Sequence, residues 1–144
     1  MMISTKGRYA LRVMIDLADQ GNGSCIPLKD IARRQGISQK YLENIMTKLS
    51  KAGLVDGVHG KGGGYCLNRA SKDYKVSEIL RLTEGTLAPV ACLDSKAQPC
   101  SRAPECRKLP FWNKLDSMIS GFLDGVSLAD FLAEVSGDDE AAPG

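Results

Sequence analysis

Residues 36–54 read GISQKYLENIMTKLSKAGL, and this stretch decides the fold because it has the pattern of one helix with two different faces. Ser38 is a favoured N-cap residue, and Gly53 is a typical residue just beyond a helix end. If Gly53 is left-handed, Leu54 should contact Leu49 in a Schellman ending. Apolar residues at helical spacing predict a buried face of Leu42, Ile45, Met46 and Leu49.

The opposite face of this helix is polar and predicts contacts with DNA. A short helix over residues 28–35 and a stop at Gly36 precede it, the order that presents a second helix to the major groove. Amide side chains can pair with adenine, glutamate can accept from cytosine, and lysine can donate to guanine. Such modules also make protein contacts, an alternative that the motif leaves open. The candidate DNA-binding residues are Gln39, Lys40, Tyr41, Glu43, Asn44, Thr47 and Lys48.

Glu43 is the unusual residue on this face. A carboxylate that faces DNA phosphates is repelled unless it finds a donor. We interpret Glu43 as a selectivity element that penalises sites lacking a suitable cytosine. The alternative is a solvated glutamate on a helix surface.

A glycine-rich hairpin is expected directly after the reading helix. Strands are predicted near residues 55–59 and 64–67, joined by the basic turn GKGG at residues 60–63. His59 and Lys61 edge this turn and are candidates for contacts with the DNA backbone or minor groove. For His59, a plain surface position is the alternative.

The other helices complete a mainly α fold with a small β wing. Helical periodicity predicts a first helix over residues 4–20 and a short helix over residues 76–84. Three helices followed by a hairpin form a winged helix-turn-helix, which we assign to residues 1–85 as a DNA-binding domain.

A long amphipathic run follows a central loop. Pro110 fits the first turn of this helix, and Ser127 is expected to cap a last short helix, so residues 110–136 form one C-terminal unit. Residues 137–144 are small and acidic and are expected to be a disordered tail. The apolar seam of the long helix contains Phe111, Trp112, Leu115, Met118, Ile119, Phe122 and Leu123.

The net charge of +2 is distributed unevenly along the 144 residues. Residues 1–86 carry fourteen basic and eight acidic side chains, whereas residues 87–144 carry five and nine. A basic first part indicates a polyanion such as double-stranded DNA, because phosphate neutralisation is the usual source of such affinity. A solvated basic surface is the alternative.

Composition also excludes several classes of protein. Every apolar run is short and broken by charged residues, so no membrane span is expected. Lys6, Arg8 and Arg12 interrupt the N-terminal apolar residues, which excludes a signal peptide and predicts a cytoplasmic protein. No close cysteine pair or other catalytic constellation is found, so we expect neither an enzyme nor a small-molecule substrate. Cys25 and Cys66 match no motif and are expected to be small buried or half-buried residues.

Residues 86–109 contain three prolines, three cysteines and no periodicity, and are expected to form a loop. Cys92, Cys100 and Cys106 are separated by seven and five residues. This spacing lacks the CxxC pairs of zinc fingers and differs from ferredoxin runs, yet three thiolates on a flexible loop can wrap one iron–sulfur cluster. The alternatives are a zinc site, reversibly oxidised thiols and an inert loop.

The usual complement of cluster ligands is four, so a fourth ligand is needed. The candidates are Glu105, Asp94, a group from another subunit and solvent. An oxygen ligand exchanges more readily than a thiolate, which suits a sensor. Arg107 and Lys108 flank the third cysteine and would offset the negative charge of the cluster.

Six short runs of sequence together resemble the Rrf-two-type bacterial transcriptional regulators, which include iron–sulfur and nitric-oxide sensors of the IscR and NsrR types. The likeness extends from about residue 3 to residue 135, and its most specific parts are the wing and the three-cysteine loop. The runs are STKGRYA (4–10), IA (31–32), GIS (36–38), YLE (41–43), AGLV (52–55) and GKGGGY (60–65).

The resemblance implies a homodimer that binds palindromic operators, with residues 111–123 as the dimer helix. It also implies that the three loop cysteines hold an iron–sulfur cluster that acts as the sensing switch. Tyr41 and Glu43 would read DNA, with Glu43 coupled to the state of the cluster. The expected dimer-interface residues are Phe111, Trp112, Leu115, Met118, Ile119 and Phe122.

The chain departs from the family pattern near the cluster. IscR-like regulators have a histidine three residues after the third cysteine, where this chain has Leu109, and the first cysteine interval is longer here by two residues. NsrR-like regulators borrow an acidic residue near the N-terminus of the partner, where this chain offers Arg8. We therefore expect a 2Fe–2S cluster with an atypical fourth ligand, followed by 4Fe–4S. A metal-free regulator that senses thiol oxidation or a protein partner is the alternative function.

Overall fold

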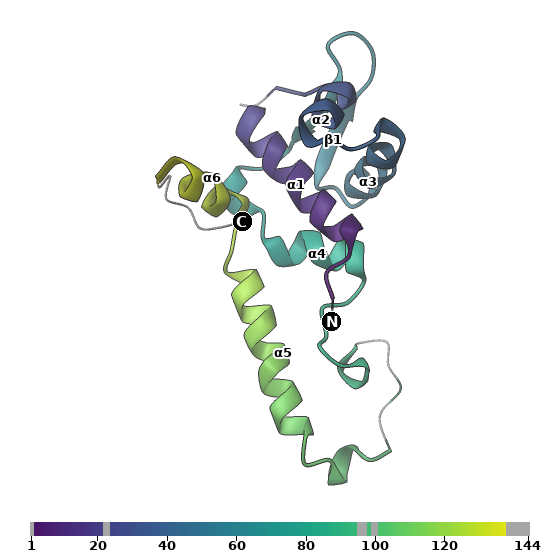
Figure 1. Ribbon diagram of the computed structural model, residues 1–144, viewed down its shortest axis with the longest axis vertical. Coiled ribbons are helices and arrows are strands. Elements are labelled where there is room, and N and C mark those ends of the chain that lie inside the picture. The colour runs from purple at the N-terminus through teal and green to yellow at the C-terminus, as the bar shows by residue number, and fades with distance from the viewer. Residues whose placement is uncertain (1, 22–23, 95–97, 99–100, 138–144) are drawn as a thin grey trace.

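The computed structural model describes residues 2–21, 24–94, 98 and 101–137. It is mainly helical with one two-stranded antiparallel sheet, so the predicted fold class is confirmed (Figure 1). Within these residues no helix has the length and apolar character needed to cross a lipid bilayer. The helices and strands are α1 (Thr5–Gln20), α2 (Leu28–Gln35), α3 (Gln39–Lys51), β1 (Val55–Val58), β2 (Gly64–Leu67), α4 (Val76–Glu84), α5 (Leu109–Asp124) and α6 (Leu128–Gly137).

Three segments differ from the sequence-based boundaries. Strand β1 ends one residue before His59, because the wing turn begins there and places Gly60 at φ 90°. The predicted loop holds two short 3-10 turns, η2 (Ala91–Leu93) and η3 (Ala103–Glu105). Helix α6 continues to Gly137, which the sequence had assigned to the tail, and residues 138–144 lie outside the described residues.

The start of α1 is fixed to the end of α4. Ser4 caps α1 by accepting a hydrogen bond from the Gly7 N–H at 3.1 Å. The Ser4 N–H and hydroxyl both donate to Glu84 Oε1, at 2.9 and 2.8 Å. A side chain at Gly7 would collide with the Glu84 carboxylate, so the glycine permits this close approach.

Helix α3 begins and ends as the sequence predicts. The Ser38 hydroxyl accepts from the Tyr41 N–H at 3.2 Å, and Gly36 is left-handed at φ 65°. At the other end Gly53 has φ 79°, and the Leu54 N–H donates to the Leu49 carbonyl at 3.0 Å. This is the Schellman ending that the sequence predicts.

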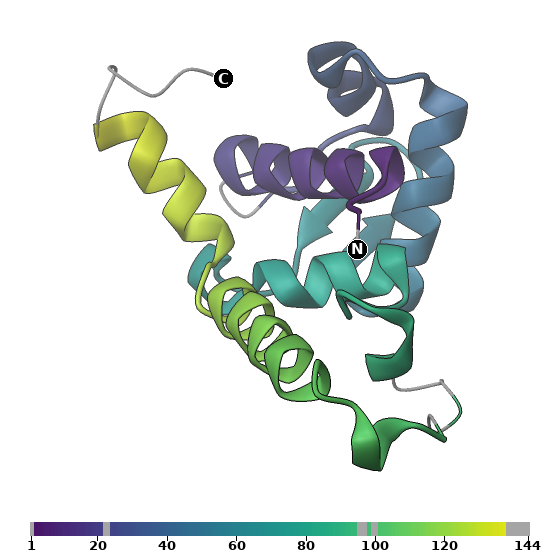
Figure 2. The same cartoon turned by 60° about the horizontal axis from the view of Figure 1, so that its bottom comes forward.

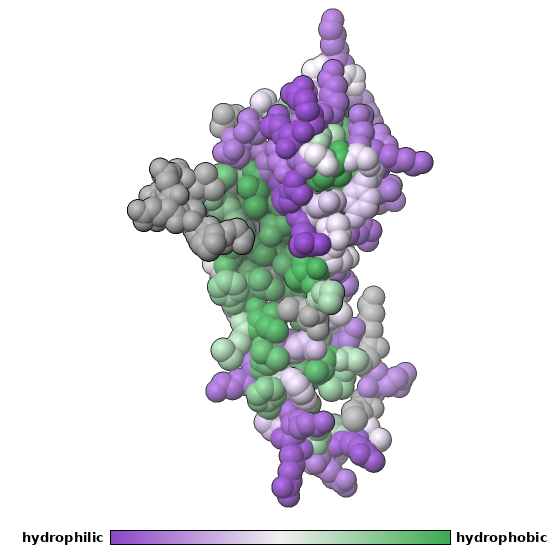
Figure 3. All heavy atoms as spheres, in the orientation of Figure 1, coloured by the Kyte–Doolittle hydropathy of each residue, from purple (hydrophilic) through white to green (hydrophobic). Residues whose placement is uncertain are grey.

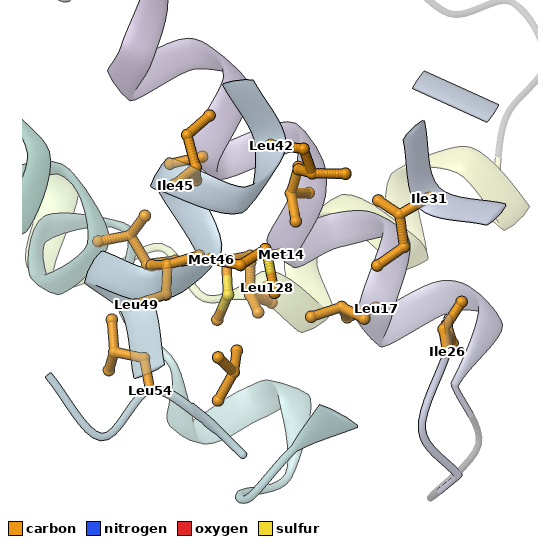
Figure 4. Close-up of a cluster of buried hydrophobic side chains, with 14 of the residues drawn as sticks. Met14, Leu17, Ile26, Ile31, Leu42, Ile45, Met46, Leu49, Leu54 and Leu128 are labelled. Carbon is orange, nitrogen blue, oxygen red and sulfur yellow. The ribbon is translucent and has the colours of Figure 1, made fainter. Parts of the chain in front are cut away.

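The main core lies between α1 and α3. The four predicted apolar residues of α3 are all buried, together with Met14 and Leu17 of α1. Figure 4 shows Met14, Met46 and Leu128 pointing toward one another at the centre of this cluster. Leu128 is 0% exposed, so α6 returns to the helix-turn-helix and completes its core. We call α1–α4, the two strands and α6 the head.

The base of the wing is tied to the end of α3. Strand β1 pairs with β2 from Val55 opposite Leu67 to Val58 opposite Gly64. Tyr74 is fully buried, and its hydroxyl donates to the Leu54 carbonyl, just before β1, at 2.8 Å. Burial also raises the pKa of the Tyr74 phenol, which therefore stays a neutral donor.

Helix α5 extends away from the head as an arm. Its C-terminal end lies beside α4, whereas its N-terminal end reaches the segment that contains η3 (Figures 1 and 2). Figure 2 also shows α6 beside α1 on the other side of the junction. No residue of α5 is buried within the chain.

Candidate DNA-binding face and cysteine loop

The polar face of α3 is open to solvent, as a base-reading helix requires. Six of the seven candidates on α3 are exposed, and only Tyr41 is half-buried. The Tyr41 ring packs edge-to-face on Tyr9 of α1, with ring centroids 5.7 Å apart. The exposed residues are Gln39, Lys40, Glu43, Asn44, Thr47 and Lys48.

Glu43 and Thr47 are neighbours on this face, but only the Thr47 side chain is held by a hydrogen bond within the helix. The Thr47 hydroxyl donates to the Glu43 backbone carbonyl at 2.8 Å, so its proton is used within the helix and its oxygen can only accept. Among the described residues, no hydrogen bond or ion pair to the Glu43 carboxylate is found. Glu43 therefore presents an unpaired carboxylate where a base donor would meet it.

Helix α2 is fixed to α1 by an ion pair whose carboxylate is buried. Asp16 of α1 is buried, and both of its carboxylate oxygens accept from the Arg34 guanidinium, at 2.7 and 3.0 Å. Gln35 donates to the same carboxylate at 2.7 Å. Two-point pairing fixes the direction of the guanidinium, and with it the angle between α1 and α2.

Lys6 is a basic residue near α3 that the sequence did not single out as a DNA contact. The pKa of its ammonium group is lowered, first by its side-chain contact with Lys48, then by repulsion between the two charges and by burial, whereas Glu84 acts in the opposite direction. Two ammonium groups held close together favour an anion such as a DNA phosphate, because it relieves their repulsion. No spacing rule links Lys6 of α1 to Lys48 of α3, so only the packing of the helices shows the pair.

The wing presents both of its predicted candidates. His59 and Lys61 are exposed, and the wing turn projects beyond the helices in Figure 1. Gly60 and Gly62 have φ 90° and 78°, which other residues rarely adopt, and the Gly63 N–H closes the turn on the Gly60 carbonyl at 3.0 Å.

The cysteine loop runs between the end of α4 and the start of α5. Cys92 is exposed in η2, which packs against α5, and Cys106 is half-buried directly after η3. The Leu109 N–H donates to the Cys106 carbonyl at 3.4 Å, so the cysteine sits in the turn that begins α5. Cys100, the third predicted ligand, lies outside the described residues.

The described part of the loop does not assemble a metal site by itself. No group of three or more His, Cys, Asp or Glu side chains that could hold a metal ion is found among the residues that the structure describes. The charge around Cys106 is basic, because Arg102, Arg107 and Lys108 are all exposed there, next to the exposed carboxylate of Glu105.

The fold and this site agree with a known family. Residues 3–134 match the model of Rrf2, described as an iron-dependent transcriptional regulator. The chain belongs to the Rrf2 family. The resemblance predicted from the wing and the cysteine loop is thereby confirmed, and the head is that of a DNA-binding transcriptional regulator.

Individual Rrf2 relatives are similar over nearly the whole chain. The transcriptional regulator IscR of Aliivibrio salmonicida is 37% identical over 134 residues, which are 93% of this chain and 79% of the relative. The structure of CymR, the global cysteine regulator of B. subtilis, has a TM-score of 0.75 and 33% identity over 93% of this chain and 98% of CymR. The structure of T. potens IscR has a TM-score of 0.72 and 35% identity, and covers 100% of this chain and 94% of that chain.

The arm of this Rrf2 chain exposes large apolar side chains. Phe111, Met118 and Phe122 are 63%, 63% and 70% exposed. Figure 3 shows hydrophobic side chains that run from the lower part of the head onto α5, whereas the top of the head and the far end of the arm are mainly hydrophilic. An apolar groove of about 750 Å³ opens at this junction, lined by Ile3, Leu11, Val76, Leu80, Phe122, Leu123, Val126 and Phe131 among others.

Proposed function

We propose that this Rrf2 chain binds palindromic operators as a homodimer, and that an iron–sulfur cluster on Cys92, Cys100 and Cys106 changes its affinity for DNA. The observation that carries the proposal is the arm. Helix α5 has no buried residue, yet it carries apolar side chains beside an apolar groove at the foot of the head.

A second copy of the chain explains this arrangement. In a two-fold dimer the same patch lies on both subunits, so an exposed ridge on one arm can pack against the arm and groove of the other. Phe111 and Met118 supply such a ridge, and Leu80 and Val126 line the groove. Covering the patch removes a large apolar surface from water, which monomeric proteins rarely leave exposed. The proposed interface is the predicted set from Phe111 to Phe122.

Dimerisation would place two copies of α3 on one DNA duplex. A dimer reads two half-sites about one helical turn apart, or a multiple of that, so its operator is a palindrome. Gln39, Lys40, Asn44 and Glu43 would meet base edges, and Lys6 with Lys48 would hold a phosphate beside them. His59 and Lys61 of the wing would contact the neighbouring backbone or minor groove.

The donor set of the loop fits an iron–sulfur cluster in its chemistry. Three thiolates are soft ligands of the kind that bind such clusters, and the basic side chains around Cys106 offset their negative charge. When bound, the cluster would supply a centre that responds to oxidants and iron supply. We favour 2Fe–2S over 4Fe–4S. Leu109 occupies the histidine position of IscR-like proteins and cannot be a ligand, which leaves Glu105 or Asp94, a group from the other subunit, or solvent.

The loop is connected to the DNA-binding face through this chain's own contacts. It begins just after Glu84, which holds the start of α1 through Ser4, and α1 carries Lys6 beside Lys48 of α3. It ends at Cys106, in the turn that begins α5. Ordering the loop would therefore alter both the spacing of the two heads and the basic pair. A difference of about 3 kcal/mol between the two states changes affinity more than 100-fold.

A metal-free regulator that senses thiol oxidation or a protein partner is the second candidate. Its support is that Cys92 is exposed and that CymR, a cysteine regulator, has a closely similar structure. In that case the cysteines of the loop would be oxidised directly.

Anaerobic purification followed by DNA selection tests the proposal. We expect bound iron and sulfide with visible absorption, loss of both in Cys92→Ala, and retention in Cys25→Ala as the matched control. DNA selected from a random pool should be palindromic, and the selected set should change when the cluster is removed. Colourless protein without iron, whose DNA selection is indifferent to iron and sulfide, would support the metal-free candidate instead.

A further inference from the structure

Two cysteines outside the loop face each other across the base of the wing. Ile26, in the segment that leads into α2, forms an antiparallel bridge with Tyr65 of β2. Each residue donates its N–H to the carbonyl of the other, and both distances are 2.9 Å. In an antiparallel pair the residue before one partner lies opposite the residue after the other, so Cys25 lies opposite Cys66.

This position suits a covalent bond between the two sulfur atoms. Ile26 and Tyr65 form the hydrogen-bonded pair, which makes Cys25 and Cys66 the adjacent non-hydrogen-bonded pair. Cα atoms in such pairs are about 4.5 Å apart and their side chains share one face of the sheet. That separation lies within the range of about 4.4–6.8 Å that disulfides span.

The two thiols are already in contact. The Cys66 thiol donates to the Asp56 carbonyl at 3.8 Å. Its side-chain interaction with Cys25, followed by burial, raises the pKa of the Cys66 thiol to about 11. Both cysteines are half-buried, so a small oxidant can reach them.

The local backbone holds the two segments in this register. Gly64 of β2 has φ 142°, and a side chain there would collide with the carbonyl of Ile26 and with Pro27. The glycine thus allows the wing to lie directly against the segment before α2. On its other side, β2 pairs with β1, and there Cys66 lies opposite Asp56.

We propose that Cys25 and Cys66 form a reversible intramolecular disulfide when a peroxide oxidises the protein, which makes them a redox site separate from the cysteine loop. The Cys25 thiolate attacks one oxygen of hydrogen peroxide, the O–O bond breaks, and the departing hydroxide takes up a proton to become water. Cys25 is now a sulfenic acid. The Cys66 sulfur then attacks the Cys25 sulfur, the S–S bond forms, and the sulfenic oxygen leaves as water with the Cys66 proton.

The two steps balance in atoms and electrons, and their order depends on which thiol keeps its proton. Two thiols lose two electrons in total, and one peroxide becomes two waters. The Cys66 S–H donates to the Asp56 carbonyl, and its raised pKa keeps the proton on that sulfur, so Cys25 is the sulfur that reacts first. A small-molecule thiol returns the pair to its reduced state by disulfide exchange.

The bond would enclose the whole reading motif. The loop of chain between Cys25 and Cys66 contains α2, α3 and β1. A cross-link over this loop restricts the unfolded chain and fixes the wing relative to α2. Oxidised protein should therefore melt several degrees higher than reduced protein. Any consequence for operator binding rests on the proposed function, whereas the chemistry of the pair does not.

Peptide mapping of the full-length protein tests the proposal without DNA or iron. The protein is treated with hydrogen peroxide, free thiols are blocked with iodoacetamide, and the chain is digested with trypsin without reduction. Cys25 falls in the peptide of residues 13–29 and Cys66 in that of residues 62–69, and neither peptide holds another cysteine. We expect these two peptides to be joined with the loss of two hydrogens, and separated by dithiothreitol.

Two single variants test the order of the steps. In Cys66→Ser the sulfenic acid at Cys25 has no partner and should be trapped by dimedone, whereas Cys25→Ser should give no such product at Cys66. Neither variant should gain thermal stability on oxidation. Separate alkylated peptides after peroxide treatment of the unaltered chain, or joining of either cysteine only to a cysteine of the loop, would overturn the proposal.

Discussion

Arg34 donates to a carboxylate, that of Asp16, which is buried so deeply that water could not replace the guanidinium as its hydrogen-bond donor. The Asp16 side chain is only 2% exposed, whereas that of Arg34 is 31% exposed. The carboxylate therefore depends on its protein donors, while the guanidinium keeps access to solvent. This asymmetry means that losing one partner of the pair does not cost the same as losing the other.

Arg34→Ala should destabilise the head more than Asp16→Ala. Removing the guanidinium leaves a buried carboxylate with Gln35 as its one remaining donor, which should cost about 2–3 kcal/mol. Removing the carboxylate instead releases Arg34 to water and should cost about 1–2 kcal/mol. Urea unfolding gives both values. Arg33→Ala is the matched control, because its pair with Asp30 spans 3.5 Å at a side chain that is 75% exposed. Equal losses in all three variants would contradict the asymmetry.

Lys6→Gln should weaken binding to every DNA sequence by a similar factor. The pair of Lys6 with Lys48 is proposed to hold a phosphate, and a phosphate contact carries no base information. Loss of one such contact should reduce the slope of log affinity against log salt by about one per chain. Folding stability should not fall, because the substitution removes a like-charge contact. Lys72→Gln, in the 3-10 turn η1 (Ser71–Asp73) packed against α6, is the control that should leave the slope unchanged.

Glu43→Ala should relax base preference without weakening all binding. The unpaired carboxylate is repelled by phosphates and is compensated only where a base donor meets it. Its removal should lower discrimination at one base pair of each half-site by about 1–2 kcal/mol and raise affinity for unrelated DNA. The measurement is affinity for an operator series with every single base change. Lys51→Ala, in the last turn of the same helix, serves as the comparison, and a uniform loss in Glu43→Ala would refute the selectivity role.

The helices of the head could be predicted because their boundaries depend on neighbouring residues. Ser38, Gly36 and Gly53 act within one or two turns of chain, and the structure shows each in its predicted role. The contacts that matter for the site join residues that are far apart in the sequence. Lys6 meets Lys48 only because α1 and α3 pack together, and Cys25 meets Cys66 only because Ile26 pairs with β2.

The last helix, α6, likewise depends on a packing partner that its own sequence does not reveal. The predicted C-terminal unit, residues 110–136, groups the last short helix, which carries Leu128, with the arm. The structure buries Leu128 in the head, beside Met14, because the turn after α5 directs the chain back toward α1. A periodic pattern indicates which face of a helix is buried and carries no information about which neighbour buries it.

Met118→Lys should convert the protein into a monomer. Met118 is 63% exposed in the single chain, so the substitution removes no packing within the monomer and should not reduce helix content. In the proposed dimer the same side chain lies in the apolar seam, where a lysine ammonium has no partner. We expect the dissociation constant of the dimer to rise at least about 100-fold, which corresponds to roughly 3 kcal/mol. Asn113→Lys, at an exposed polar position of α5, is the control, and a Met118→Lys dimer as tight as the unaltered one would exclude α5 as the interface.

The pH at which Cys66 becomes reactive toward an alkylating agent should reveal its contact with Cys25. Only the thiolate is alkylated, and the pKa of Cys66 is raised to about 11, first by its side-chain interaction with Cys25, then by burial, by the charge of Cys25 and by the charge of Asp56. Alkylation of Cys66 should therefore be slow near pH 8 and approach its maximum rate only above about pH 11. Cys25→Ala removes both causes that come from Cys25 and leaves burial and the charge of Asp56, so the midpoint should fall part of the way toward the ordinary thiol value of about 8.5. An exposed reference thiol in the same chain is Cys92. If Cys66 reacts at the same rate as Cys92 across this range, or if Cys25→Ala leaves its midpoint unchanged, the two sulfur atoms are not in contact.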